Sequence, residues 1–460
     1  MRQLTSIAFL ALSVGSSLST PAMSQSLMET FASAYMTNPT LEARRAQLRG
    51  VDENVNQALS LWRPTVTGTA SAGAGYFHSN PSSDRDQTRT PTSLQLEVNQ
   101  PLYRGGRNAA SLSQAESQVL SERAAVLAVE QTVFQQAGTA YMNVVRDQAV
   151  VELSKSNEEV LRRQLQATRD RFQVGEVTRT DVSQGEARLS RAIADRRAAE
   201  GSLETSRADY EQVVGKAPGV LKQPTVIANL PGSRREAIER SQSENPAVVQ
   251  AVFAQEAAAH NVDVVHGELL PSAALVGQLN HIYESSINNG RSYSAQALAR
   301  VTIPLYQSGS VRSRVRQAKE VASQRLVQVE EARRAAIENA TASWEQLAAT
   351  RRRIEALRAE VKSQEIALDG VKQEALVGTR TVLDVLDAEQ ELLNARVDLV
   401  RAQRDEVVAA LSLASAVGLL SAEALQLDVP RYDVRVHYES VRGQWFGTDV
   451  GSPWRPADKK

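Results

Sequence analysis

A long helical run that stops at a glycine constrains the fold of this chain more than any other feature. About seventy residues before Gly378 keep helical periodicity without a proline. Glycine readily adopts the left-handed backbone conformation that ends a helix. Thr381 and Asp384 then have the Thr-x-x-Asp spacing of a helix start, and a second apolar-periodic run follows them. The sequence therefore predicts two long antiparallel helices joined by a sharp turn.

The same turn occurs earlier in the chain. VGEVTRTDV, residues 174–182, has Gly175, Thr178 and Asp181 at the equivalent positions. Other matches lie 207 or 203 residues apart, namely Asn38-Pro39 with Asn245-Pro246, and Pro101-Leu102-Tyr103 with Pro304-Leu305-Tyr306. A period this long indicates a duplicated domain rather than a solenoid.

The duplication divides the chain into five predicted segments. They are a signal peptide (1–24), a first repeat (25–215), a connector (216–244), a second repeat (245–427) and an irregular C-terminal tail (428–460). We expect each repeat to contain a helix, a β-hairpin and a long helical hairpin. The β-hairpins are predicted at 64–102 and 271–304, and the helical hairpins at 106–214 and 309–418.

The first 24 residues have the features of a secretory signal. Arg2 is their only charge, residues 7–18 are apolar, and Ala22-Met23-Ser24 has the small-x-small pattern of a cleavage site. A membrane-spanning helix needs about 20 apolar residues, and this segment is shorter. We therefore expect the mature chain to begin at Gln25. The absence of cysteine excludes lipid attachment at that position and excludes disulfides.

Composition argues against several classes of function. The formal net charge of −1 gives no sign of a nucleic-acid partner. The five histidines are scattered, and His260 and His266 are spaced wrongly for one helical face. There is no glycine-rich phosphate loop ahead of a helix. We therefore expect no metal site, no cofactor and no enzymatic activity.

Helix lengths favour an elongated bundle. Each long helix of about 70 residues would span about 105 Å. The return helices of about 36 residues and the helices before the strands of about 24 residues would span about 54 and 36 Å. Placed end to end, one of each nearly matches a long helix. Apolar residues at sevens, such as Val119, Val126 and Val133, indicate coiled-coil packing between such helices.

The segments between the helices alternate with a period of two. Val66, Ala70 and Ala72 alternate with threonine and serine, and Leu94 and Leu96 with polar residues. Strands of about ten residues with two distinct faces have the length needed to cross a bilayer at a tilt. Four strands leave two open edges, which lipid does not tolerate, so several copies would have to close one barrel. Strands of a small soluble domain are the alternative.

Together these features resemble the TolC family of outer-membrane channel proteins. The signal peptide, the helix–strand–strand–helix–turn–helix unit present twice, and the turns VGEVTRTDV and VGTRTVLDVLDA carry the resemblance. It covers about residues 30 to 425, and GTRTVLDVLDAEQELLNAR is its most specific part. The missing cysteine after the signal is closer to the TolC type than to lipid-anchored efflux members.

The resemblance implies a mainly α-helical fold with a membrane β-barrel. Three chains would contribute twelve strands to one outer-membrane barrel and twelve helices to a tapered tunnel through the periplasm, with residues 216–244 at its equator. It also implies a passive exit duct for type I protein secretion or for efflux. This homotrimer would contact outer-membrane lipid and dock to an inner-membrane transporter through a periplasmic adaptor protein.

The resemblance further implies a gate at the periplasmic end. Arg380 would hold the tunnel shut, with Thr180 and Asp181 as its partners. Asp384 and Asp387 would form acidic rings at the constriction, and Gly175 and Gly378 would form the turns. The TolC type has a tyrosine five residues before the arginine, whereas this chain has Ala375, which puts one gating hydrogen bond in doubt.

Other interpretations of these residues remain open. Asp181 and Asp384 each occupy the third helical position, where a carboxylate caps the helix. Arg380 could be an ordinary exposed turn residue, and Asp387 could lie on a solvated helix face. At the level of the whole chain, the alternative function is a periplasmic coiled-coil adaptor that bridges the two membranes. An adaptor needs one hairpin flanked by β-rich domains, whereas this chain has two hairpins and strands of bilayer length.

Overall fold

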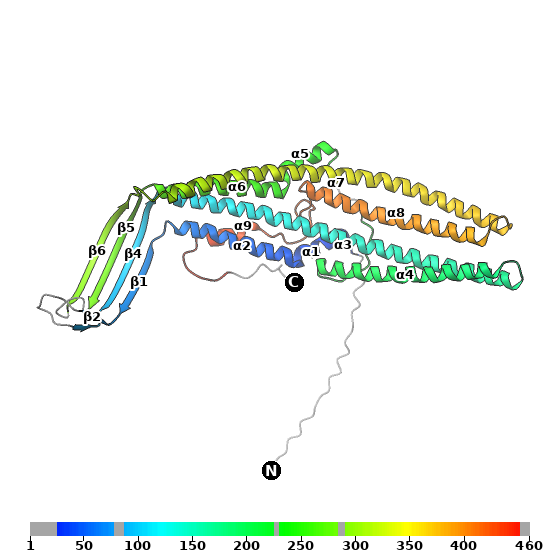
Figure 1. Ribbon diagram of the computed structural model, residues 1–460, viewed down its shortest axis with the longest axis horizontal. Coiled ribbons are helices and arrows are strands. Elements are labelled where there is room, and N and C mark those ends of the chain that lie inside the picture. Colours follow the sequence, from blue (N-terminus) through cyan, green and yellow to red (C-terminus); the bar gives the residue numbers. More distant parts are fainter. Residues whose placement is uncertain (1–24, 78–86, 225–229, 284–289, 451–460) are drawn as a thin grey trace, which may run out of the picture.

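The protein is a long rod of helices with a β-sheet at one end (Figure 1). The computed structural model describes residues 25–77, 87–224, 230–283 and 290–450. The predicted signal peptide, residues 1–24, lies outside the described residues. None of the helices in the described part of the chain combines the length and the apolar composition of a membrane-spanning helix.

Each repeat contains a short helix, a helix of 67 residues and a return helix. The long helices extend about 100 Å each. The helices of the first repeat are α2 (Pro39–Ser60), α3 (Arg107–Gln173) and α4 (Arg179–Val214), and those of the second are α6 (Pro246–His266), α7 (Ser310–Leu376) and α8 (Val382–Ala416).

The shorter helices lie end to end beside the long ones. α2 and α4 both pack along α3, and α6 and α8 both pack along α7 (Figure 1). α3 also packs against α6 and α8, which joins the two repeats into one layer. This stacking matches the predicted bundle of continuous and divided helices.

An asparagine begins the short helix of each repeat and ties it to the return helix. The Asn38 side chain accepts hydrogen bonds from the amides of Thr40 and Leu41, while its own Nδ2 donates to the carbonyl of Val213 at 3.0 Å. Asn245 repeats this arrangement, since its Nδ2 donates to the Ala416 carbonyl at 3.0 Å. One residue thus caps a helix and fixes the junction between stacked helices.

The four predicted strands form one antiparallel sheet in the order β1-β4-β5-β6. β1 and β6 are its edges, and neither has a second neighbour among the described residues. A separate two-stranded sheet, β2 with β3, was not predicted. The bounds are β1 (Thr65–Ala72), β2 (Gly75–Phe77), β3 (Gln87–Arg89), β4 (Thr92–Arg104), β5 (Ser272–Tyr283) and β6 (Arg291–Thr302).

The apolar face of the large sheet is the more exposed one. Leu96 pairs with Leu279 across β4 and β5, and both side chains are exposed. On the opposite face, Gln278 Nε2 donates to Glu97 Oε2 at 2.8 Å, and this contact is partly buried. A sheet that faced water would show the reverse pattern, so the apolar face suits lipid.

Aromatic residues from the N-terminal segment fill the core midway along the rod. Helix α1 (Leu27–Thr37), which was not predicted, buries Phe31 and Tyr35 against α3. The rings of Phe31 and Phe134 are 5.2 Å apart. Two short elements remain: α5 (Arg234–Glu244), which lies between the two repeats, and the 3₁₀ helix η1 (Gly267–Leu269), which lies between α6 and β5.

The prediction of an irregular tail over residues 428–460 is wrong in part. Helix α9 (Val434–Arg442) lies in this segment and packs against α2. The Asp433 side chain begins the helix by accepting from the amide of Arg435 at 2.8 Å. A helix of nine residues is too short to be stable alone, so its contacts with α2 account for it. Those contacts cannot be read from local periodicity.

Candidate functional site at the tips of the helical hairpins

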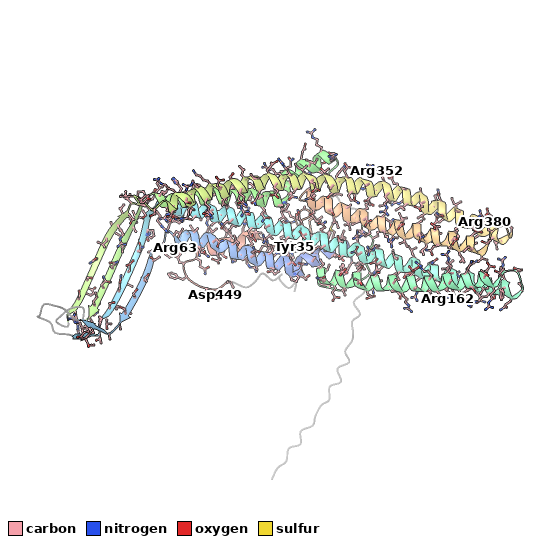
Figure 2. The ribbon with its side chains drawn as sticks, in the orientation of Figure 1. Tyr35, Arg63, Arg162, Arg352, Arg380 and Asp449 are labelled. Carbon is pink, nitrogen blue, oxygen red and sulfur yellow. The ribbon has the colours of Figure 1, made fainter. Side chains whose placement is uncertain are left out.

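The α3–α4 and α7–α8 hairpins both end at the end of the rod away from the sheet (Figure 1). Figure 2 shows Arg380 at the free end of the α7–α8 hairpin. Gly175 and Gly378 have φ angles of +79° and +82°. A Cβ added at either glycine would meet nothing within 4 Å. Glycine is therefore required by the backbone conformation of these turns and not by lack of space.

Both return helices start with a capping box. The Thr178 amide donates to Asp181 Oδ2 at 2.8 Å, and the Thr381 amide donates to Asp384 Oδ2 at 2.9 Å. Hydrogen bonds from the backbone and hydroxyl of Thr381 lower the pKa of Asp384, and the charge of Arg380 adds to this effect. Asp181 and Asp384 therefore both cap helices, as the simpler interpretation predicted.

Within the single chain, Arg380 pairs with a residue of its own hairpin. Its Nε donates to Glu374 Oε2 at 2.8 Å across the turn, and both side chains are half-exposed. The hydrogen bond and charge of Glu374 raise the pKa of Arg380. Thr180 and Asp181 are not among its bonded partners in the described part of this chain. They lie at the start of α4, on the other hairpin.

Asp387 connects the two hairpins. Its Oδ1 accepts a hydrogen bond from Arg188 Nη2 at 2.5 Å, so the pair joins α8 to α4. Beside this pair, Leu161, Ala192 and Leu386 form a small buried cluster contributed by α3, α4 and α8. Near the tips, the hairpins are therefore held together by one ion pair and a few apolar side chains.

Other ion pairs near the tips stay within one hairpin. Arg169 and Glu186 join α3 to α4 at 2.6 Å, and Lys372 and Glu389 join α7 to α8 at 2.5 Å. Between the described residues of α3 or α4 and those of α7 or α8, Arg188–Asp387 is the only ion pair. Near the tips, each hairpin is thus braced by its own ion pairs, whereas a single ion pair joins the described residues of the two hairpins.

Sequence reasoning missed Arg188 and Glu374. Glu374 lies six residues before Arg380, and a search for acidic residues that could fold back across the turn would have found it. Arg188 carries no local signal, because α4 contains several exposed arginines. Only the packing of one hairpin on the other selects it as the partner of Asp387.

The groups at the tips can form and break polar contacts. They are carboxylates, guanidinium groups and threonine hydroxyls, most of them exposed. Across the described residues, no group of three or more histidine, cysteine or acidic side chains is arranged to hold a metal ion. Rearrangement of the hairpins is the change that such contacts can control.

Comparison with known proteins gives a consistent result. The outer membrane efflux protein family matches residues 32–216 and 237–419, which correspond to the two repeats. The outer membrane efflux protein BepC of Brucella suis is 35% identical over 429 residues, covering 93% of this chain and 92% of BepC. The outer membrane protein TolC of Escherichia coli is 27% identical over 438 residues, covering 90% of this chain and 86% of TolC.

Solved structures share the fold. The outer membrane channel CmeC of Campylobacter jejuni aligns with a TM-score of 0.77 at 16% identity, covering 91% of this chain and 89% of CmeC. The resemblance to the TolC family and the outer-membrane location predicted from the sequence are thereby confirmed. The chain belongs to the outer membrane efflux protein family, a family of efflux and secretion channels.

Proposed function

We propose that three copies of this chain form an exit duct that crosses the outer membrane and extends into the periplasm. The duct passively conducts proteins or small toxic compounds handed over by an inner-membrane transporter and a periplasmic adaptor. It catalyses no reaction, and its periplasmic tip opens and closes. In this proposal the mature chain starts at Gln25, which an intact-mass measurement would test.

The open sheet supports assembly into a trimer. Within the described residues, β1 and β6 each leave one edge without a partner, and the exposed face between them is apolar. Unpaired strand edges are not stable in lipid, so β1 of one chain has to pair with β6 of another. Three chains with four strands each reach a barrel wide enough to hold a channel.

The contact between the hairpins carries the proposal of a gate. The Arg188–Asp387 pair and the cluster around Leu386 hold the α7–α8 hairpin to the α3–α4 hairpin near the tips. Breaking a single exposed ion pair and a small apolar contact requires little free energy. The α7–α8 hairpin can therefore move away from its neighbour while each hairpin keeps its own internal contacts.

Arg380 and the tip aspartates complete the proposed gate. In the trimer, Arg380 bonds to Thr180 and Asp181 of a neighbouring chain, either in place of Glu374 or in addition to it. A guanidinium group has five donors in a planar fork, which suits such a bridge. Asp384 and Asp387 surround the axis as acidic rings that attract cations. Arg188 neutralises Asp387 while the hairpins are in contact, so opening adds negative charge at the constriction.

Single-channel recording tests this function. Purified protein that migrates as a heat-modifiable trimer should form channels in planar bilayers, with a low conductance set by the closed tip. Variants that break the hairpin contact should conduct more. Trimers that insert and conduct equally well with and without that contact would overturn the gate. Failure to insert as a trimer would overturn the duct itself.

A further inference from the structure

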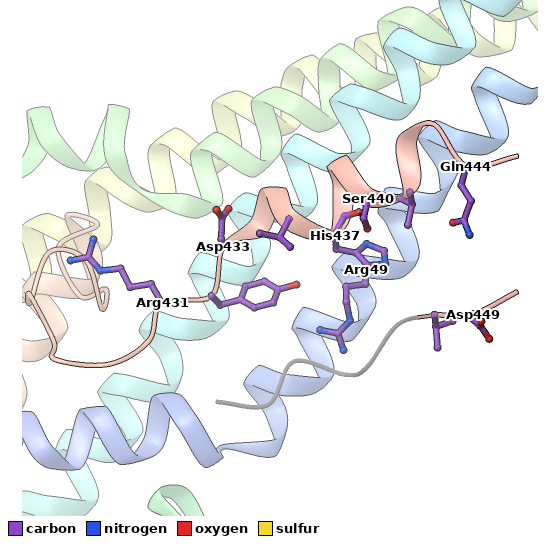
Figure 3. A pocket seen from close by; sticks show the side chains of 11 residues that line it. Arg49, Arg431, Asp433, His437, Ser440, Gln444 and Asp449 are labelled. Carbon is purple, nitrogen blue, oxygen red and sulfur yellow. The ribbon is translucent and has the colours of Figure 1, made fainter. Parts of the chain in front are cut away.

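The C-terminal segment runs along α2 toward the sheet. His437 Nδ1 lies 3.0 Å from Asp52 Oδ2, and Arg63 Nη1 donates to the carbonyl of Gln444 at 2.7 Å. Asp52 lies about 12 Å before the end of α2 at Ser60, and Arg63 lies beyond that end. Figure 3 shows α9, which carries His437 and Ser440, lying beside the helix that carries Arg49. Residues 431–446 therefore form a strap that ends where α2 meets β1.

The strap is fixed to the rod along its length. The Tyr432 amide donates to the Tyr35 hydroxyl at 2.9 Å, and Arg442 pairs with Glu116 at 3.0 Å. Val441, a residue of the strap, is buried. Asp52, which faces His437, is almost completely buried, and this burial raises its pKa. The end of the strap is thus held at a defined position.

Two aromatic side chains project from this fixed end. Trp445 is 59% exposed, and Phe446 is 88% exposed. The Arg63 guanidinium lies 4.6 Å from the centre of the Trp445 ring, which orients that ring. Arg63 itself is held by Asn56, whose Oδ1 accepts from Nη2 at 3.1 Å. Adjacent aromatic rings held outward in this way mark a contact surface.

The position of the rings identifies the surface they contact. Arg63 precedes Pro64, and β1 begins one residue later at Thr65. Figure 2 shows Arg63 at this junction, with Asp449 of the strap's continuation on the same side of the rod. Tryptophan and other aromatic side chains gather where a membrane-spanning segment meets the polar headgroups.

Exposed aromatic residues from other elements lie at the same end of the strands. Trp62 precedes Arg63, Tyr103 lies near the end of β4, and Tyr306 lies between β6 and α7, where it is 86% exposed. Trp445 and Phe446 lie at this same end of the strands, but they belong to the strap and not to a strand. The aromatic band is therefore built from both the sheet and the C-terminal segment.

We propose that Trp445 and Phe446 insert into the headgroup region of the periplasmic leaflet of the outer membrane. The strap then fixes the height of the helical rod relative to the bilayer, with Arg63 as the residue that positions the rings. The inference rests on the proposed membrane-spanning sheet. Trp445 and Phe446 thus contact the phospholipid interface. This contact surface is continuous with the exposed apolar face of the strands.

The absence of cysteine makes a direct test possible, because one introduced cysteine can be labelled alone. Full-length Phe446→Cys would carry a fluorescent label in proteoliposomes of phosphatidylethanolamine and phosphatidylglycerol. We expect strong quenching by lipids that carry a spin label near the headgroup and weak quenching by iodide. Val436→Cys on α9, which is exposed and farther from the sheet, should show the opposite pattern.

Two further variants separate the possible failures. A label at Tyr293→Cys on the exposed face of β6 should be quenched by the lipid spin label if the sheet spans the membrane. Quenching at residue 293 without quenching at residue 446 would overturn the inference alone. No lipid quenching at either position would overturn the membrane-spanning sheet as well. If neither quencher reaches the label at residue 446, protein and not lipid covers that residue. This result would also overturn the inference.

Arg63→Ala tests the positioning role. In the Phe446→Cys background, loss of the Gln444 and Trp445 contacts should release the end of the strap. The expected result is a several-fold rise in iodide quenching and a matching loss of lipid quenching. Unchanged quenching by both agents would mean that Arg63 does not position the rings.

Discussion

Arg188 Nη2 lies 2.5 Å from Asp387 Oδ1, and this ion pair joins two helical hairpins that come from different repeats of one chain. Both side chains are partly exposed, at 37% and 55%. Exposed pairs of this kind contribute about 0.5 kcal/mol each. Three symmetric pairs would then bias the closed tip by about 1.5 kcal/mol, a change of roughly tenfold in the closed-to-open ratio. A docking partner could supply that free energy easily.

Replacing Arg188 tests this contact. Arg188→Gln should raise single-channel conductance and cation selectivity, because the hairpins separate more often and Asp387 loses its counter-charge. Arg169→Gln is the matched control, since Arg169 also makes an exposed pair but within one hairpin. If both substitutions change the conductance equally, the contact between hairpins has no special role.

Separate substitutions of Arg380 and Glu374 distinguish two roles for Arg380. It either holds neighbouring chains together or only stabilises the turn within its own chain. Arg380→Ser should increase conductance and sensitise cells to large antibiotics, while trimer assembly and heat stability stay nearly unchanged. Glu374→Gln removes the partner within the chain but leaves Arg380 free to reach Thr180 and Asp181 of a neighbour. It should therefore leave the channel closed. Equal conductance of the two variants, both above wild type, would reduce Arg380 to a turn residue.

The tip aspartates should determine ion selectivity. Replacing Asp384 and Asp387 together by alanine removes six carboxylates from the proposed trimer. We expect lower cation selectivity and weaker block by trivalent cations in planar bilayers. Selectivity and block that match the wild-type channel would mean that these residues only cap and solvate a helix.

The pKa of Asp384 predicts how its contribution depends on pH. Bonds from Thr381 hold the pKa of Asp384 below its ordinary value of 3.8. A carboxyl group with a lowered folded-state pKa stabilises the protein fully above the ordinary value and loses that contribution as pH falls through the lowered one. Asp384→Asn should therefore lower Tm at neutral pH, with a difference that disappears in strong acid. Asp369→Asn, an exposed residue of α7 without an ion pair among the described residues, should show little difference at either pH.

Replacing the turn glycine by alanine should lower the stability of the protein, whereas replacing a helical glycine should not. Gly378→Ala forces a side chain into the left-handed conformation at φ +82° and should cost about 1 kcal/mol. Gly370→Ala lies in α7, where an added Cβ meets nothing within 4 Å, so it should be neutral or stabilise by up to about 1 kcal/mol. Thermal unfolding of both variants would show whether the backbone of the turn sets the difference.

Local signals accounted for much of this molecule. Asn38-Pro39 and Asn245-Pro246 begin helices, Gly175 and Gly378 end them, and strand alternation separates Leu96 from Glu97. Each of these features depends on residues close together in sequence. Because the chain is duplicated, the helices, turns and strands predicted for one repeat also predict those of the other.

The missed features depend on contacts between distant segments. α9 is stable because it packs on α2, and Arg188 becomes important because α4 lies beside α8. The sequence placed Asp387 on a helix face but gave no means of choosing its partner. Tertiary packing decides such pairs, and local periodicity along the chain does not encode it.

A reversible cross-link between residues 188 and 387 tests the gate most directly. The chain has no cysteine, so Arg188→Cys combined with Asp387→Cys gives one reactive pair. A short bis-thiosulfonate linker is needed, because a direct disulfide requires Cα atoms within about 7 Å. Mass spectrometry would confirm linkage within each chain before single-channel recording. We predict low conductance with the linker in place and a marked, reversible rise after reduction. Equal conductance before and after reduction of fully linked trimers would contradict a gate that opens by separating the two hairpins.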